Sequence, residues 1–216
     1  MTAADPSRFW NRFAHKYAER KVPDPQAYER TLEHTRRHLK SSDALFEFGC
    51  GTGTTAIKLA PSVARVVATD ISAQMIAIAR ERAQAAGCSN VEFETATPDA
   101  APWADNSFDI AVGFNVLHLV EARAAALAGV RRLLKPGGLF ISKTPCLKDA
   151  NPLFALVVPV MQVFGQAPYV GFLSGAELEG EIAAAGFEIV ERAWHATMRQ
   201  GSRRKDPRPF FVARKV

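Results

Sequence analysis

Residues 44–53 read Ala-Leu-Phe-Glu-Phe-Gly-Cys-Gly-Thr-Gly, and this stretch decides the predicted fold. Its first half is apolar and typical of a buried strand. Its second half carries glycine at alternate positions, at Gly49, Gly51 and Gly53. A helical pattern of apolar residues begins directly afterwards, at Ala56. The order strand, tight loop, helix follows from this pattern.

The glycines of this loop indicate a ligand. Glycine adopts positive φ without strain and lets the backbone come close to a bound molecule, because it has no Cβ. The helix that follows offers unpaired N–H groups and a positive dipole end, which favour a carboxylate or a phosphate. We therefore expect a nucleotide-like ligand at this loop.

The spacing of the loop narrows the choice of ligand. The dinucleotide fingerprint G-x-G-x-x-G/A needs a small residue in its last place, and Thr54 stands there. Glu47 lies two residues before the first glycine. A carboxylate in this position would repel a pyrophosphate but would suit a ligand that carries an ammonium group and a sulfonium.

The stretch resembles motif I, E/D-x-G-x-G-x-G, of the class I S-adenosylmethionine (SAM) dependent methyltransferases. Glu47, Gly49, Gly51 and Gly53 match it position by position, and Cys50 lies inside the same loop. The resemblance implies that these residues bind SAM as cofactor and that S-adenosylhomocysteine is the product.

Two further motifs are similar to the branch of this family that includes the ubiquinone and menaquinone biosynthesis methyltransferases. The first is Pro-Trp-Ala-Asp-Asn-Ser-Phe-Asp at 102–109, and the second is Lys-Pro-Gly-Gly at 135–138. We expect the second to form a turn before a strand at 139–143. The motifs place the resemblance on residues 43–143.

Strand and helix patterns alternate along the chain, which predicts an α/β fold. We expect a Rossmann-like, doubly wound sheet of seven mostly parallel strands with the last one antiparallel, an N-terminal helical cap and an apolar lid insertion. A single methyltransferase domain would divide into four parts. These are the cap at 1–42, the cofactor-binding core at 43–144, the lid at 145–173, and the C-terminal helix and antiparallel strands at 174–216.

Asp70 ends the second expected strand, about 20 residues beyond the loop, where a carboxylate accepts hydrogen bonds from both ribose hydroxyls of an adenosine. Ser72 is a good N-cap for the next helix and leaves Asp70 for the ligand. Ile71 and Met75 follow, where the family holds adenine between apolar side chains. A role in the core suits both equally well.

The adenine site departs from the family pattern. Where the family usually has an aspartate that accepts a hydrogen bond from the adenine amino group, this chain has Thr97. Recognition by backbone amides near Ala96 and Thr97 is the expected substitute. In the family the residues after the fourth strand line the methyl-transfer chamber, so Asn115 is a candidate contact for the methionyl part.

Two other residues are candidates with a structural alternative. Tyr17 follows Phe9, Trp10 and Phe13 along an amphipathic N-terminal helix, and in the family such a tyrosine reaches the cofactor. His118 is a candidate general base, although a histidine between two leucines is more often a packed structural residue.

Amino-acid composition and charge limit the kinds of partner that we expect for this protein. The 216 residues are 48% hydrophobic and 23% charged with a formal net charge of +5, as in an ordinary globular domain. Basic clusters at 36–38 and 203–205 lack interleaved aromatic residues, so nucleic acid is not an expected partner. Three scattered cysteines and the absence of clustered His, Asp and Glu predict no metal site. With no apolar signal core at the N-terminus, we expect a cytoplasmic protein.

Residues 145–173 contain the most apolar run of the chain. A run cut by Pro159 is too short to span a membrane, which takes ~20 apolar residues. A lid over an apolar acceptor, contact with a membrane that supplies it, and packing on the N-terminal helices are the open interpretations.

The sequence thus predicts in-line methyl transfer from SAM to a small lipophilic molecule. The alternatives are a Rossmann oxidoreductase that uses NAD, which Glu47 and the missing fingerprint residue oppose, and a non-catalytic SAM-binding regulatory protein. The oligomeric state is left open.

Overall fold

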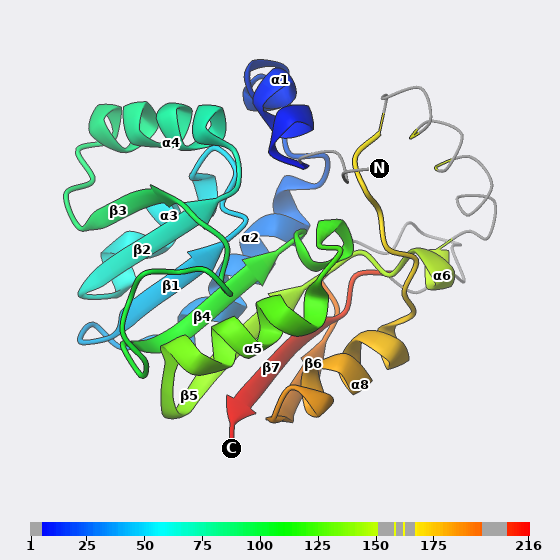
Figure 1. Cartoon of the computed structure of the whole chain (residues 1–216). Coiled ribbons are helices and arrows are strands. Elements are labelled where there is room, and N and C mark those ends of the chain that lie inside the picture. Colours follow the sequence, from blue (N-terminus) through cyan, green and yellow to red (C-terminus); the bar gives the residue numbers. More distant parts are fainter. Residues whose placement is uncertain (1–5, 151–157, 159–161, 163–166, 196–206) are drawn as a thin grey trace.

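A computed structural model describes residues 6–150, 158, 162, 167–195 and 207–216. A seven-stranded sheet runs through the middle in the order β3-β2-β1-β4-β5-β7-β6 (Figure 1). The first five strands in this order are parallel, and β7 is antiparallel to both of its neighbours. The predicted seven-stranded α/β fold with an antiparallel last strand is confirmed.

The bounds of the elements follow the sequence patterns closely. The strands are β1 (Ala44–Phe48), β2 (Arg65–Asp70), β3 (Val91–Thr95), β4 (Phe108–Phe114), β5 (Leu134–Lys143), β6 (Phe187–Ala193) and β7 (Phe210–Lys215). The main helices are α1 (Pro6–Ala18), α2 (Pro25–Arg36), α3 (Thr54–Leu59), α4 (Ala73–Ala85), α5 (Arg123–Leu133) and α8 (Gly175–Ala184), with a short α6 (Leu147–Ala150).

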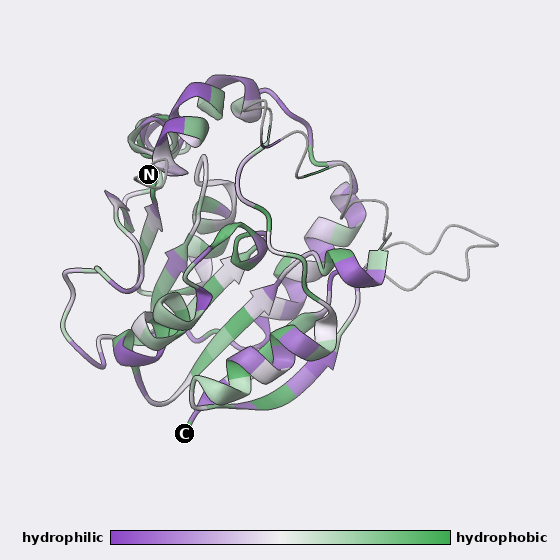
Figure 2. Cartoon of the chain, turned by 45° about the vertical axis from the view of Figure 1, so that its right-hand side comes forward, coloured by the Kyte–Doolittle hydropathy of each residue, from purple (hydrophilic) through white to green (hydrophobic). Residues whose placement is uncertain are grey.

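Two hydrophobic clusters, one on each face, hold the helices to the sheet. One joins α5 and α8 to β4 and β5, and the other joins α2, α3 and α4 to β1, β2 and β7. In Figure 1, α5 and α8 lie in front of the sheet. Figure 2 shows hydrophobic residues on the strands and hydrophilic residues on the outer turns of the helices. Burial of both sheet faces explains why the parallel strands read as apolar runs.

The N-terminal helices form the expected cap. Pro25 begins α2 in a position where its missing N–H costs nothing, and the Asp24 side chain accepts a hydrogen bond from the Ala27 amide at 2.8 Å. The α1 helix packs on α4 through buried Ala14, which meets Met75. Through α4, the helix α1 therefore packs over the part of the sheet that carries the glycine loop.

One local prediction is wrong. Lys135-Pro-Gly-Gly138 does not form a turn before the strand, because β5 already begins at Leu134. Leu134 pairs with Phe108 and Leu139 pairs with Ile110, so the four residues between them bulge out of the ladder. Gly137 has a φ of +74°, which a bulge accommodates with glycine.

Much of the predicted lid and the basic cluster at 203–205 lie outside the described residues. In the part that is described, Leu173 is buried in the core and its carbonyl accepts a hydrogen bond from the Lys148 amide. Ser174 caps α8 through a complete capping box with Glu177. Within the described residues, no helix is both long and apolar enough to cross a bilayer.

Candidate cofactor site

The glycine loop forms the floor of the candidate site, where β1 ends and α3 begins. Gly49, Gly51 and Gly53 all have positive φ, at +64°, +54° and +79°. A Cβ on Gly49 would lie 2.2 Å from a methyl group of Val116, and one on Gly53 would lie 2.9 Å from the ring of Phe93. Glycine is therefore required here by backbone conformation and by packing.

Glu47 is the most unusual group of the site. Its side chain is buried near the end of β1, and its Oε2 atom has no hydrogen-bond partner among the residues that the structure describes. Burial, with repulsion from Asp70 as the second cause, raises the pKa of Glu47 to about 8, although the Ala56 amide opposes the shift. A buried acceptor without a partner carries a cost that a ligand donor or cation would remove.

Asp70 ends β2 beside the same loop, as predicted. Its Oδ2 accepts a hydrogen bond from the Gly51 amide and its Oδ1 accepts one from the Ser72 amide, both at 2.9 Å. Burial raises the pKa of Asp70, and these backbone bonds counteract the shift. Ser72 caps α4 by accepting from the Met75 amide, so the two residues have separate tasks. These two amides, together with that of Ile71, orient the Asp70 carboxylate.

Tyr17 reaches the glycine loop from the cap. A Cβ on Gly51 would lie 3.6 Å from the Tyr17 ring, although 41% of the tyrosine surface is exposed. Burial of the hydroxyl and the nearby Asp70 carboxylate raise the pKa of Tyr17. The ring thus covers the loop while the side chain remains partly open to solvent.

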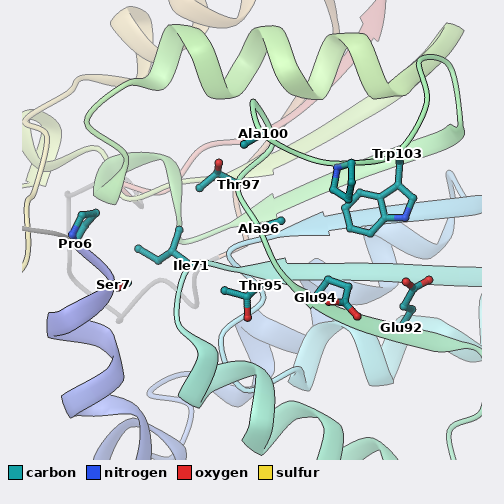
Figure 3. Close-up of a pocket in the computed structure, with 11 residues that line it drawn as sticks. Pro6, Ser7, Ile71, Glu92, Glu94, Thr95, Ala96, Thr97, Ala100 and Trp103 are labelled. Carbon is teal, nitrogen blue, oxygen red and sulfur yellow. The ribbon is translucent and has the colours of Figure 1, made fainter.

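A cavity of about 750 Å³ opens beside the ends of β2 and β3 (Figure 3). Ile71, Ala96 and Thr97 line it, so the structure brings together three of the residues predicted at the adenine end. The Ala96 amide donates to the Asp70 carbonyl at 3.2 Å, which leaves the Thr97 hydroxyl and amide as the nearer candidates for polar recognition.

Several residues of this cavity were not predicted. They are Pro6 and Ser7 at the start of α1, Glu92, Glu94 and Thr95 on β3, and Ala100, Pro102 and Trp103 in the following loop. The motif that contains Pro102 and Trp103 was noticed, but its role as a wall was not. Only the three-dimensional path of the loop brings Trp103 to the cavity that Ile71 also lines (Figure 3).

Met75 and Cys50 lie inside the protein. Met75 is 2% exposed and packs with Ala14 and Ile78, so the core alternative accounts for it, and it does not line the cavity. Cys50 is buried, its amide donates to the Thr69 carbonyl, and burial keeps the pKa of its thiol well above the ordinary value. Its backbone is part of the loop, whereas its side chain is an inert thiol.

Asn115 follows β4 with a φ of +54°, and its exposed side chain points away from the core. Its amide donates to the Lys143 carbonyl at 2.7 Å, which extends the pairing of β4 with β5 by one bond. Lys143 is almost completely buried at the end of β5, and the sequence analysis missed it. A single lysine at the end of an apolar strand was the available signal.

His118 lies in the 3₁₀ turn after β4. Its carbonyl accepts a hydrogen bond from the Gly171 amide at 2.7 Å, and its buried Nδ1 has no partner among the described residues. Burial lowers the pKa of His118 to about 4. The imidazole is therefore neutral near pH 7 and a weaker base than an ordinary histidine.

The structure brings together three potential metal ligands that the sequence analysis did not predict. His34 and His38 stand four residues apart, and both approach Glu191 on β6. The spacing was visible in the sequence, but the distant carboxylate was not.

The arrangement fits a ligand with a cationic centre and an adenosine. Glu47 offers to the cation a buried oxygen that has no partner among the described residues, Asp70 offers a carboxylate to ribose hydroxyls, and the cavity beyond Ile71 admits a flat apolar ring. The glycine loop removes side chains from the space between them.

Comparison with known proteins agrees with this geometry. The family described as methyltransferase domain matches residues 45–138. Demethylmenaquinone methyltransferase of Clavibacter sepedonicus is 30% identical over 195 residues, which are 78% of each chain. The Ubiquinone/menaquinone biosynthesis C-methyltransferase UbiE of Francisella philomiragia is 29% identical over 62% of this chain, and the match spans about half of that relative, 54%.

Among solved structures, a SAM-dependent methyltransferase from Methanosarcina mazei superposes with a TM-score of 0.71. It is 21% identical and covers 85% of this chain and 97% of its own. A likeness at this identity supports the fold alone.

Proposed function

Because the chain belongs to the class I SAM-dependent methyltransferases and uses SAM as its cofactor, we propose that it methylates a small lipophilic acceptor and that a quinol-like aromatic ring is the acceptor class. The observation that supports the cofactor part of the proposal is the pair of buried carboxyl groups, Glu47 and Asp70, at the ends of neighbouring strands around the glycine loop.

The side chains have distinct roles in this proposal. Glu47 faces the positively charged methionyl part, Asp70 accepts from the ribose hydroxyls, and the cavity lined by Ile71, Ala96 and Thr97 holds the adenine. Each group is fixed by the fold before the ligand arrives, which reduces the entropic cost of alignment.

SAM supplies a methyl group on a sulfonium that is already a good leaving group. The protein therefore contributes alignment and exclusion of water, and alignment is worth ~7 to 11 kcal/mol in favourable systems. The acceptor atom forms a bond to the methyl carbon as the bond to sulfur breaks, and the acceptor then loses one proton. His118 is neutral near pH 7 and is our candidate to receive this proton, a role that stays a prediction.

Two observations favour an aromatic, apolar acceptor. The relatives described above carry names that refer to methylation of quinone precursors, and the segment 152–164 that follows α6 in the sequence is rich in Val, Leu and Phe. A quinol ring has electron-rich carbon atoms that attack a methyl group without a metal. The NAD alternative finds no support in the relatives described above.

The test is turnover of SAM with three matched acceptors, namely a short-chain demethylnaphthoquinol, a simple phenol and a primary aliphatic amine. Methylation of the quinol ring carbon, shown by mass spectrometry of the product, is the expected result. Tight SAM binding with methylation of the amine alone would overturn the acceptor class, and failure to bind SAM would overturn the proposal itself.

A further inference from the structure

Three side chains with metal-binding chemistry converge on the edge of the sheet at β6, between the cap and the strand. His34 Nε2 lies 2.5 Å from Glu191 Oε1, and His38 Nε2 lies 3.1 Å from Glu191 Oε2. One ligand atom from each residue lies within 4.8 Å of the others. We propose that His34, His38 and Glu191 bind a divalent transition-metal ion, Zn²⁺, which ties α2 to β6.

The local structure explains why these rings meet. His34 is in the last turn of α2 and His38 follows just after its end, where the His38 amide donates to the Thr35 carbonyl. A separation of four residues places two side chains on one face of a helix. Their rings are 5.8 Å apart and nearly parallel, with an interplanar angle of 20°. Both nitrogen atoms therefore face the same carboxylate.

Hydrogen bonds behind His34 hold its ring in place. The Thr31 hydroxyl donates its single proton to the Ala27 carbonyl at 2.8 Å. It must therefore act as acceptor for its other partners, Lys143 Nζ at 2.7 Å and His195 Nδ1 at 3.1 Å. This assigns a proton to Nδ1 of His195.

His195 also supports His34. Its Nε2 atom lies 2.9 Å from His34 Nδ1, so one of these two nitrogen atoms donates a hydrogen bond to the other. The remaining ring nitrogen of His34, Nε2, faces the carboxylate of Glu191 at 2.5 Å. A shared proton fits this distance as it stands, whereas a metal ion bound by both residues would move the two atoms apart to about 3.3 Å.

The position of His38 favours a metal ion. Its Nε2 atom is buried 3.1 Å from Glu191 Oε2, yet it makes no hydrogen bond of acceptable geometry to any described residue. A proton shared by His34 and Glu191 would not change this. A metal ion would bind both imidazoles and the carboxylate together, so it satisfies every one of these atoms.

The donor set and its surroundings suit Zn²⁺. Two imidazoles and a carboxylate are typical zinc ligands, and bonds of ~2.0 Å in a tetrahedron place ligand atoms about 3.3 Å apart. The His38–Glu191 separation of 3.1 Å is close to this value, whereas the His34–Glu191 separation of 2.5 Å would widen when the ion binds. The chain from His34 through His195 to Thr31 is the kind of outer hydrogen-bond support that orients metal-binding histidines.

The site would have a structural consequence, because its ligands come from elements far apart in the sequence. Glu191 is on β6, which pairs only with β7 in the described sheet, whereas His34 and His38 belong to the cap. An ion that binds all three residues stabilises the folded chain and has little affinity for the unfolded one. This proposal does not depend on the methyl acceptor.

The test is direct titration of metal-stripped protein from which any histidine tag has been removed. Zn²⁺ would be measured in competition with a chromophoric chelator, and Co²⁺ by its visible absorption, which is intense in tetrahedral sites. Matched variants are His38→Ala and Glu191→Gln, which remove one ligand each at half-buried positions. His15→Ala on the exposed side of α1 is the control.

We expect one equivalent of Zn²⁺, an affinity at least about 10-fold weaker in either ligand variant, and an unchanged affinity in the control. Zn²⁺ should also raise the Tm of the wild type but not of the two variants. No binding below about 100 µM, or binding that the ligand variants leave unchanged, would overturn the site; circular dichroism of each variant confirms that it is folded.

Discussion

The carboxyl groups of Glu47 and Asp70 repel each other across the end of the glycine loop, and this repulsion adds to burial in raising the pKa of Glu47 to about 8. A positively charged ligand would relieve this repulsion. Without one, the site favours a proton on Glu47 near neutral pH. With one, the ionised carboxylate is favoured.

Binding of SAM should therefore release a proton. Because the positive charge of the ligand favours ionised Glu47, the affinity should increase with pH by up to about 10-fold per unit below pH ~8. Calorimetric titration at about pH 7 in two buffers of different ionisation enthalpy measures the proton. Equal heats in both buffers would contradict a contact between Glu47 and the cation, and Glu47→Gln is the variant in which proton release should vanish.

The free protein should lose stability as pH rises through the same range. The pKa of Glu47 is raised on folding, so its proton stabilises the folded state fully at low pH, and this contribution is lost as pH rises from ~4.5 to ~8. The slope is at most about 1.4 kcal/mol per pH unit for one proton. Urea unfolding of wild type and Glu47→Gln across this window checks it. An equal slope in both proteins would show that Glu47 ionises normally.

Asp70→Asn should weaken SAM binding by ~1.5 to 3 kcal/mol, which is roughly 10- to 150-fold in Kd, because hydrogen bonds to a charged acceptor are lost. The backbone bonds of Asp70 to Gly51 and Ser72 complicate this result, since they also order the loop.

A cofactor analogue separates the two effects of Asp70. Wild type should discriminate against 3′-deoxy-S-adenosylhomocysteine, whereas the Asn variant should bind it and the normal compound more nearly alike. Equal discrimination by both proteins would exclude the ribose contact. Glu94→Gln, in the wall of the same cavity, is the matched carboxylate control.

Gly49→Ala should unfold part of the site. The new methyl group would lie 2.2 Å from Val116, and the backbone has a φ of +64°, so we expect a loss of ~1 to 3 kcal/mol in stability and little SAM binding. Gly49→Ala with Val116→Ala relieves the clash but not the strain and should recover only part of the loss.

Gly180→Ala is the matched control for the glycine substitution. Gly180 is an exposed residue of α8 with open space at its Cβ position, so this change should stabilise the protein by about 1 kcal/mol. Chemical unfolding of the three variants gives the comparison. A stable Gly49→Ala protein that binds SAM normally would show that the loop adapts.

His118 should remain neutral down to about pH 5, because burial lowers its pKa to about 4. Its ring proton resonance, assigned by its loss in His118→Gln, should not shift between about pH 8 and 5 in an NMR titration. A midpoint near 6.5 would show that the ring is hydrated. In turnover assays, loss of kcat in His118→Gln with unchanged SAM affinity would support its role as proton acceptor.

Local sequence patterns predicted where the main residues of the cofactor site lie. The glycines, Glu47 and Asp70 lie at strand ends that the apolar runs define, so their approach follows once parallel strands are assumed. The helix cap at Ser72 was readable for the same reason, because a cap is formed within four residues.

Contacts between distant segments could not be predicted in this way. Trp103 enters the cavity through the path of an irregular loop, and Met75 is turned into the core by the packing of α1 on α4. The approach of Glu191 to His34 depends on where the edge strand falls against the cap, a separation of 157 residues along the chain. No local pattern carries that information.

The position of β7 constrains the order in which the sheet is assembled. β7 is paired on one side with β5 and on the other with β6, and the sheet offers β6 no other partner. β6 precedes β7 in the chain, so it must wait for β7 or join the sheet together with it as a docked pair. Leu139 pairs with Arg214, and the long stretch of chain between them contains α6, α8 and β6. Bringing together residues so far apart in the sequence is slow. Ala44 of β1 pairs with Arg65 of β2 over a much shorter stretch of chain, so we expect this part of the sheet, which carries the glycine loop, to form first during folding.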